Sequence, residues 1–323
     1  MNGMPLQTKA KYGCGTVLIL LLVLNQAAMA AGGAAGTDHY LLSSEGRLIH
    51  RLNTKPGDAV DPVAEMYAHV EKEELTVFHF DNSRAWQKRA QGAKWVCFGP
   101  RAIIVTTETG LVGFAKDTGR ELYRTDIPWA SLAGSWFPKP DEAGPDAAFA
   151  YFAYCTQSSE KVEGGMLPVI EGPVTLIKIN IETGQRVWMA SYMWPRRNDR
   201  IRGVEPGIIL GDSCVYFDTA MGKRLTDRPP TTRVAAPKNA PAPASAPALS
   251  LPAQTSILMY TENIIFALER KGRAPNTLIA FTLQGKEQWR WPIPPAEGMD
   301  GESLQVVRCK SAFLVIQKWF RGE

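Results

Sequence analysis

The sequence predicts an all-β fold built from repeated four-stranded sheets. A unit of apolar strand, tight turn with glycine, and returning strand with an aromatic residue recurs along the chain. Short runs rich in β-branched and aromatic residues fill the intervals, and several intervals are close to the roughly 40 residues of a four-stranded repeat. Helical periodicity is weak, and Glu65–Glu74 is its only short candidate. These observations predict stacked antiparallel sheets.

Three copies of the unit are strong, and each part has a physical reason. Glycine adopts a positive φ without a Cβ clash, which suits a hairpin turn. The aromatic residue, four positions past the glycine, lies on the returning strand, where it can cover the seam to the next sheet. One hairpin alone is marginally stable in water, so the copies have to stack. The strong copies are Leu111–Lys116 with Gly119 and Tyr123, Leu176–Asn180 with Gly184 and Trp188, and Leu278–Phe281 with Gly285 and Trp289.

Weaker copies place further turns near residues 57, 83 and 222. The interval from 57 to 83 is short for one repeat, so one of these two copies is open to question. Strands are also expected at both ends of the chain, within Tyr40–Leu52 and at Leu304–Val307 and Phe313–Ile316. We expect these terminal strands to pair within one sheet, because such pairing removes exposed edges.

The unit of apolar strand, Asp or Glu, Thr, Gly, three residues and Trp resembles the repeat of quinoprotein-like (PQQ-like) β-propellers. The best copies end at Trp188 and Tyr123, and the resemblance covers most of residues 39–320. It implies a β-propeller of four-stranded blades, with six blades favoured and seven the next alternative. In such repeats the tryptophan docks neighbouring blades and does no chemistry, so we expect these aromatic residues to serve the core.

The first 30 residues are typical of a secretory signal peptide. Lys9 and Lys11 are their only charges, the apolar run Val17–Leu24 follows, and Ala28-Met29-Ala30 is a small-x-small cleavage pattern. The apolar run is shorter than the roughly 20 residues of a spanning helix, although an uncleaved signal anchor is the alternative. We therefore expect residues 31–323 to form a single propeller domain, exported to the periplasm, with no integral membrane span after cleavage.

Residues 229–254 are dominated by proline and alanine. They hold too little bulky apolar surface to pack, which predicts a disordered insertion between blades. A proline-rich docking segment is the alternative. Two further long loops, Ser135–Asp146 and Gln157–Gly172, are expected between strands, and loops on a rigid scaffold commonly carry binding sites.

Four cysteines remain after signal cleavage, far apart and without metal-ligand spacing: Cys97, Cys155, Cys214 and Cys309. Buried free thiols are the favoured interpretation, and two disulfides are the alternative that export permits. The four histidines, His39, His50, His69 and His79, show no ligand-like pattern, so we expect structural or exposed roles for them. No metal or cofactor site is predicted.

The most basic stretch of the chain is a candidate partner-binding loop. It runs from Trp194 to Arg202 and combines an aromatic residue with four arginines, a composition favoured in binding hot spots. A solvated loop between blades is the alternative. The candidate binding residues are Trp194, Arg196, Arg197, Arg200 and Arg202.

Composition and motifs favour a binding protein over an enzyme. The chain carries a formal net charge of +4, of which the signal contributes two lysines, so a nucleic-acid partner is not expected. It contains no nucleophile elbow, phosphate loop, dinucleotide fingerprint or zinc motif, and no catalytic residue is predicted. The resemblance implies an exported, non-enzymatic scaffold that binds proteins of the bacterial cell envelope, as in outer-membrane protein assembly.

Two departures from known members of the family bear on this expectation. The outer-membrane assembly member is lipid-anchored, whereas in this sequence Cys14 precedes the apolar run and no cysteine lies at the predicted cleavage site. The alternative function is a quinone-dependent dehydrogenase of alcohols or sugars. Such family enzymes are larger and carry a vicinal cysteine pair, which this sequence lacks.

Overall fold

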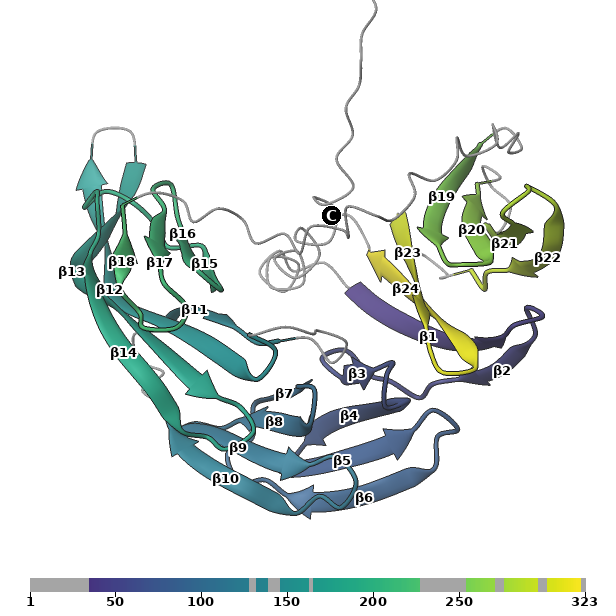
Figure 1. Cartoon of the computed structure of the whole chain (residues 1–323), viewed down its shortest axis with the longest axis horizontal. Helices are drawn as coiled ribbons and strands as arrows, with labels where there is room; N and C mark the ends of the chain where they lie inside the picture. Colours follow the sequence, from purple (N-terminus) through teal and green to yellow (C-terminus); the bar gives the residue numbers. More distant parts are fainter. Residues whose placement is uncertain are drawn as a thin grey trace, which may run out of the picture.

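Six antiparallel four-stranded sheets make up the described part of the protein, which in this computed structural model comprises residues 35–127, 132–138, 146–162, 165–226, 254–270, 276–295 and 301–320. The sheets follow one another along an arc, with the first strand of each toward the centre and the fourth at the rim (Figure 1). The predicted all-β class with six four-stranded blades is therefore confirmed. The helical candidate Glu65–Glu74 is wrong, because this segment forms a strand and a turn.

We number the blades in chain order. Blade 1 contains β3 (Ala59–Asp61), β4 (Met66–Glu71), β5 (Glu74–His79) and β6 (Arg84–Arg89). Blade 2 contains β7 (Trp95–Phe98), β8 (Ala102–Thr106), β9 (Gly110–Ala115) and β10 (Glu121–Asp126). Blade 3 contains β11 (Leu132–Trp136), β12 (Phe149–Val162), β13 (Gly165–Asn180) and β14 (Arg186–Met193).

The remaining blades are shorter or contain the chain ends. Blade 4 contains β15 (Gly203–Glu205), β16 (Ile208–Leu210), β17 (Val215–Phe217) and β18 (Arg224–Leu225). Blade 5 contains β19 (Thr255–Tyr260), β20 (Ile264–Glu269), β21 (Thr277–Thr282) and β22 (Glu287–Pro292). Blade 6 contains β23 (Gly301–Arg308), β24 (Ala312–Phe320), β1 (Ala35–Ser43) and β2 (Leu48–Arg51).

Blade 6 joins the two ends of the described chain. Strand β1 pairs with β24 along its whole length, from Ala35 opposite Phe320 to Ser43 opposite Ala312. The N-terminal strands thus form the outer half of this blade and the C-terminal strands its inner half (Figure 1). The prediction that terminal strands pair within one blade is confirmed.

Apolar side chains between neighbouring blades form the core. Within the described residues, five such seams hold a buried cluster: blades 1 and 2, 2 and 3, 3 and 4, 5 and 6, and 6 and 1. Alternate residues of the two middle strands face opposite seams, so Leu176 packs toward blade 4 and Ile177 toward blade 2. Blades 4 and 5 stand at the two ends of the arc (Figure 1).

The repeat aromatic residues dock the rim strands of blades 1, 2, 3 and 5 onto the next blade, as predicted. Each ring lies against the turn residue of positive φ in the following blade, where a Cβ would collide with it. Three indole Nε1 atoms also donate to a backbone oxygen of that turn: Trp86 to Lys116 at 2.8 Å, Trp188 to Thr219 at 3.1 Å and Trp289 to Ser44 at 2.8 Å. The ring–glycine pairs are Trp86 on Gly119, Tyr123 on Gly184, Trp188 on Gly222 and Trp289 on Gly46.

Of the weaker predicted turns, the one near residue 57 is wrong and the one near residue 83 is confirmed. The turn of blade 6 lies at Gly46, whereas Gly57 lies in the connection from β2 to β3, so the repeat copy near residue 57 is wrong. The turn of blade 1 has Asn82 at the position that glycine takes elsewhere, with φ of 64°. Asparagine tolerates this left-handed conformation better than most residues. Its side chain accepts from Asn53 N and donates to Arg51 O, both at 3.0 Å.

Other predictions fall partly or wholly outside the described residues. The signal peptide at residues 1–30 and the insertion 229–254, apart from Gln254, lie outside them. The four cysteines from Cys97 to Cys309 are free thiols; Cys155 and Cys309 are buried and Cys97 is half-buried. Cys214 is exposed, so the prediction that all four are buried is wrong for this residue. No described segment forms a helix with the length and apolar character that crossing a bilayer requires.

Candidate interaction surface

Blade 3 carries a two-stranded arm that projects beyond the other strands. Residues 156–162 of β12 pair with residues 165–171 of β13, past the points where β11 and β14 stop pairing. The arm extends from the upper left of the arc (Figure 1). This corrects the expectation of a loop over Gln157–Gly172, whose described residues instead belong to the paired strands β12 and β13.

The end of the arm exposes apolar side chains. Met166 is 62% exposed, Leu167 39% and Val162 38%. At the base of the arm, Val169 and Ile170 are buried, and Ile170 joins the core between blades 3 and 4. The arm is thus anchored in the blade while it presents apolar groups to solvent, an arrangement suited to a protein contact.

The basic loop at residues 194–202 connects β14 to β15 and is held by one buried carboxylate. Asp199 accepts hydrogen bonds from Trp194 Nε1, Asp212 N and Ser213 N, each at 2.8 Å. Burial alone would raise the pKa of Asp199, but these hydrogen bonds favour the charged form and lower it overall. The loop therefore has a fixed shape around a permanently charged centre.

Trp194 does not lie on the surface, which corrects its prediction as a binding residue. Its ring is only 8% exposed and packs in the cluster between blades 3 and 4. The hydrogen bond to Asp199 satisfies its indole N–H inside the protein. Trp194 therefore anchors the loop in the core between blades 3 and 4.

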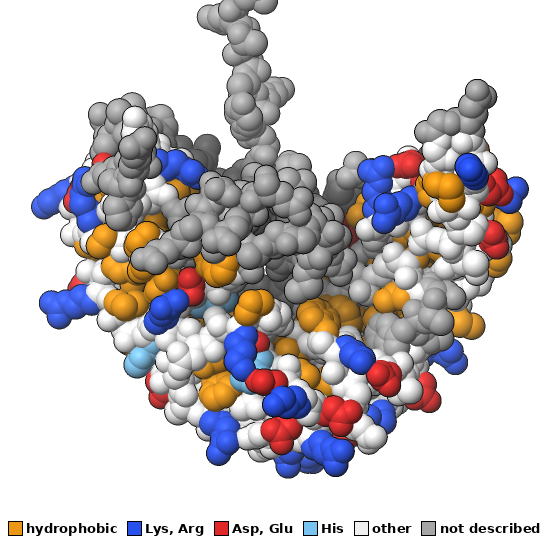
Figure 2. All heavy atoms as spheres, turned by 180° about the vertical axis from the view of Figure 1, so that it is seen from behind, with side chains coloured by type: hydrophobic (Ala, Val, Ile, Leu, Met, Phe, Trp, Pro, Cys, Tyr) orange, Lys and Arg blue, Asp and Glu red, His pale blue; other side chains and the backbone are white. Residues whose placement is uncertain are grey.

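The four arginines of the loop are exposed, and they divide into two pairs. Arg197 forms an ion pair with Glu160 of the arm at 2.5 Å, and its backbone oxygen accepts from Ile170 N at 2.9 Å. Arg202 forms an ion pair with Asp212. Arg196 and Arg200 have no ion-pair partner among the described residues. From behind the molecule, basic side chains gather beside the arm (Figure 2).

The arm was expected as a long loop of the kind that carries binding sites, and its hairpin structure was not predicted. The interval between Gly119 and Gly184 is too long for one blade, which marked an insertion without giving its structure. Apolar and polar residues alternate only weakly along the arm, because both of its faces are partly solvated. Pro168 further weakens the sequence signal for a strand, since proline is rare inside sheets. The basic loop, in contrast, was found from composition alone.

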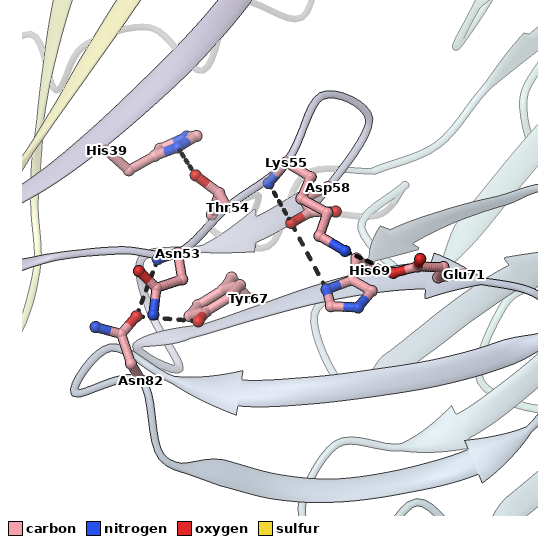
Figure 3. A network of polar contacts seen from close by, with 9 residues as sticks. All are labelled: His39, Asn53, Thr54, Lys55, Asp58, Tyr67, His69, Glu71 and Asn82. Carbon is pink, nitrogen blue, oxygen red and sulfur yellow. Dashed lines mark hydrogen bonds and ion pairs between the residues drawn. The ribbon is translucent and has the colours of Figure 1, made fainter.

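A second cluster of polar residues lies at the seam between blades 6 and 1 (Figure 3). His39 Nδ1 lies 2.8 Å from Thr54 Oγ1, and Tyr67 donates to Asn82 Oδ1 at 3.0 Å. His69 Nδ1 is 3.9 Å from Asp58 Oδ2, too far for a hydrogen bond. The contact of His39 with Thr54 ties the connection between β2 and β3 to blade 6, and Asn53 N, which donates to Asn82 Oδ1 at 3.0 Å, ties it to blade 1.

Burial shifts the titration of this seam cluster. It lowers the pKa of His39 to about 4, against the opposing effect of the Asp38 carboxylate, and it lowers the pKa of His69. It raises the pKa of Asp58 to about 6. The described residues contain no group of three or more His, Cys, Asp and Glu side chains placed to hold a metal ion.

Comparisons with known proteins name no relative. No family model matches the chain, and no curated protein does. Among solved structures, it is similar to the computationally designed protein Ika8 (8% identity, 81% of this chain and 95% of that chain, TM-score 0.28). It is also similar to a eukaryotic initiation factor (10%, 84% and 78%, 0.29) and to the dihydro-heme d1 dehydrogenase NirN (11%, 79% and 73%, 0.28). With TM-scores this low, these similarities identify neither a family nor a function.

Proposed function

We propose that this chain is a non-enzymatic β-propeller of the PQQ-like kind, exported to the periplasm, that acts as a protein-interaction scaffold in the bacterial cell envelope. The observation that carries the proposal is the arm of blade 3 beside the basic loop. The arm presents Met166, Leu167 and Val162 to solvent, and the loop presents Arg196 and Arg200. Apolar groups beside arginines are typical of protein-binding surfaces.

The rigidity of both elements supports this function. Ion pairing of Arg197 with Glu160 joins the loop to the arm, and Asp199 fixes the loop from within. A surface that is already ordered loses little conformational entropy when a partner binds. An envelope partner with an acidic and apolar face, such as a component of outer-membrane protein assembly, is the expected ligand.

The test is recovery of the native partner with charge-reversed variants. The double variant Arg196→Glu and Arg200→Glu places repulsive charge on the loop while leaving the Arg197 and Arg202 ion pairs in place. We expect it to lose the partners that co-purify with the parent protein after crosslinking in cells. The matched control is Arg120→Glu, an exposed arginine in a turn of blade 2. Unchanged partner recovery with the double variant would contradict the proposal.

A separate assay addresses the non-enzymatic part of the proposal. The purified chain is incubated with PQQ and calcium and then tested for dye reduction with a panel of alcohols and sugars. The proposal expects no turnover. Stoichiometric binding of the quinone with turnover would establish the alternative dehydrogenase function.

A further inference from the structure

The rim strands of the blades differ in how their outer edges are protected. Among the described strands, the fourth strand of each sheet is hydrogen-bonded to one neighbour only, so its other edge is a template for pairing with another chain. Proteins protect such edges with charged side chains. The rim strands of blades 1, 2, 3 and 5 each carry a docked aromatic residue, so positions counted from this residue correspond in the four strands.

The residue directly after the docked aromatic ring shows the difference. This residue is Gln87 in blade 1, Arg124 in blade 2 and Arg290 in blade 5. Each of the three side chains is held by a neighbouring side chain. Gln87 donates to Glu74 at 2.6 Å, Arg124 pairs with Glu121 at 3.1 Å, and Arg290 pairs with Glu287 at 2.7 Å. Three edges therefore carry a polar or charged side chain fixed in place.

In blade 3 the same position is Met189, which is 56% exposed. The other exposed residues of β14 after Arg186 are also uncharged: Val187 is 47% exposed, Ser191 is exposed and Met193 is 68% exposed. From Val187 onward, β14 therefore exposes three apolar side chains and a serine, and no charged side chain. Such a row on an open edge is a marker of a binding or aggregation site.

The edge of β14 is also longer and more regular than the other rim edges. After the irregularity near Ile179, Trp188–Met193 pairs residue by residue with Pro173–Lys178. The regular parts of β6, β10 and β22 after their irregularities are shorter, namely Trp86–Arg89, Tyr123–Asp126 and Trp289–Pro292. Strand β14 therefore offers the longest straight template among these rim strands.

The end of β14 supplies positive charge. The chain passes directly from Met193 into the basic loop, which contains Arg196 and Arg200. Arg224 of blade 4 donates to Met193 O at 3.2 Å, so a third guanidinium lies at this end. An occupant of the edge would meet apolar side chains along β14 and arginines where it ends.

We propose that β14 is a docking edge for an extended segment of a partner protein, a segment that alternates apolar and polar residues and carries acidic residues at one end. The segment adds a fifth strand to blade 3 through backbone hydrogen bonds. Its apolar side chains contact Val187, Met189 and Met193, and its acidic end meets Arg196, Arg200 and Arg224. This inference rests on the proposed function and specifies its partner.

The test uses the full chain and a displayed library of linear peptides. We expect selection to enrich peptides that alternate apolar and polar residues and end in acidic ones. N-methylation of alternate amides in an enriched peptide should abolish binding, because it removes the donors that face β14. The variant Met189→Lys should weaken binding roughly tenfold or more, because it places a charged side chain at the position where blades 2 and 5 carry an arginine. The matched control is Leu122→Lys on β10, which should bind like the parent.

The outcomes separate this inference from the proposed function. Both variants are first checked for an unchanged thermal melt, since Met189 and Leu122 are exposed. Failure to enrich any peptide, binding that Met189→Lys leaves unchanged, or a dimer of this chain that Met189→Lys dissociates would overturn the docking edge. If reversal at Arg196 and Arg200 removes the native partner while Met189→Lys does not, the proposed function stands and the docking edge is wrong.

Discussion

The indole of Trp188 lies on Gly222 of the next blade so closely that a Cβ at Gly222 would approach the ring to within 2.8 Å. Gly222 has φ of 69°, a conformation that favours glycine, and Trp188 Nε1 donates to Thr219 O in the same turn. One side chain thus covers the seam between blades 3 and 4 and satisfies a backbone acceptor. The same arrangement at Trp86 and Trp289 makes it the repeated joint of the fold.

Removing the ring should weaken this joint. We expect Trp188→Ala to lower the free energy of unfolding by about 3 kcal/mol, because a half-buried ring and its hydrogen bond are lost together. Trp188→Phe should cost less, since part of the packing remains. Chemical denaturation monitored by circular dichroism measures both. Trp95, which is 41% exposed, serves as the comparison. If Trp95→Ala lowered the free energy of unfolding as much as Trp188→Ala does, Trp188 would not stabilise the joint more than an exposed tryptophan elsewhere.

The buried imidazole of His39 should make the fold sensitive to acid. Its pKa is lowered to about 4 in the folded state, whereas the unfolded value is about 6.5. Between these values the unfolded chain binds a proton that the folded chain does not, so stability falls as the pH falls from 6.5 to 4. Over this window we expect the parent to lose about 3 kcal/mol more than His39→Gln.

Asp58 should act in the opposite direction across the same seam. Its folded-state pKa is raised to about 6, so the folded chain binds the extra proton between pH 4 and 6, and stability falls as the pH rises. The variant Asp58→Asn keeps an acceptor for Lys55 N but cannot ionise. We expect it to be about 2 kcal/mol more stable than the parent at pH 7 and no more stable at pH 4. Equal effects at both pH values would contradict the raised pKa.

The free thiols should differ sharply in reactivity. Burial raises the pKa of Cys309 to about 12 and also raises the pKa values of Cys97 and Cys155, whereas Cys214 is exposed. Because the thiolate is the reactive form, we expect a thiol reagent at neutral pH to modify Cys214 first among the described cysteines. Mass spectrometry of the digested protein identifies the site. The Cys214→Ser variant is the control and should show no fast phase from the described residues.

The parts of the fold that follow from local chemistry were predictable from the sequence. Turn glycines and the aromatic residues four positions later reveal the blade joints, because each joint needs a positive φ and a ring at a fixed spacing. Gly57 misled this pattern, because the turn of blade 6 lies at Gly46 and Gly57 belongs to the connection from β2 to β3. The turn near residue 83 was found, although Asn82 takes the positive φ there in place of a glycine.

The candidate surface was less predictable, because its features depend on contacts between distant segments. The arginines of the loop are visible as composition, but the burial of Trp194 depends on Asp199 and on packing between blades 3 and 4. The exposed row on β14 is significant only by comparison with β6, β10 and β22, where the corresponding position carries a polar or charged side chain. That comparison needs the register of each sheet, which the sequence does not supply.

The most direct measurement of the central claim is site-specific photo-crosslinking in the native cell. A photoreactive residue replaces Met166 at the end of the arm or, as a control of matched exposure, Tyr260 on blade 5; these side chains are 62% and 60% exposed. The account predicts a discrete crosslinked partner from position 166 that disappears with Arg196→Glu and Arg200→Glu, and none from position 260. Identical products from both positions, or a product at 166 that survives the arginine reversal, would contradict it.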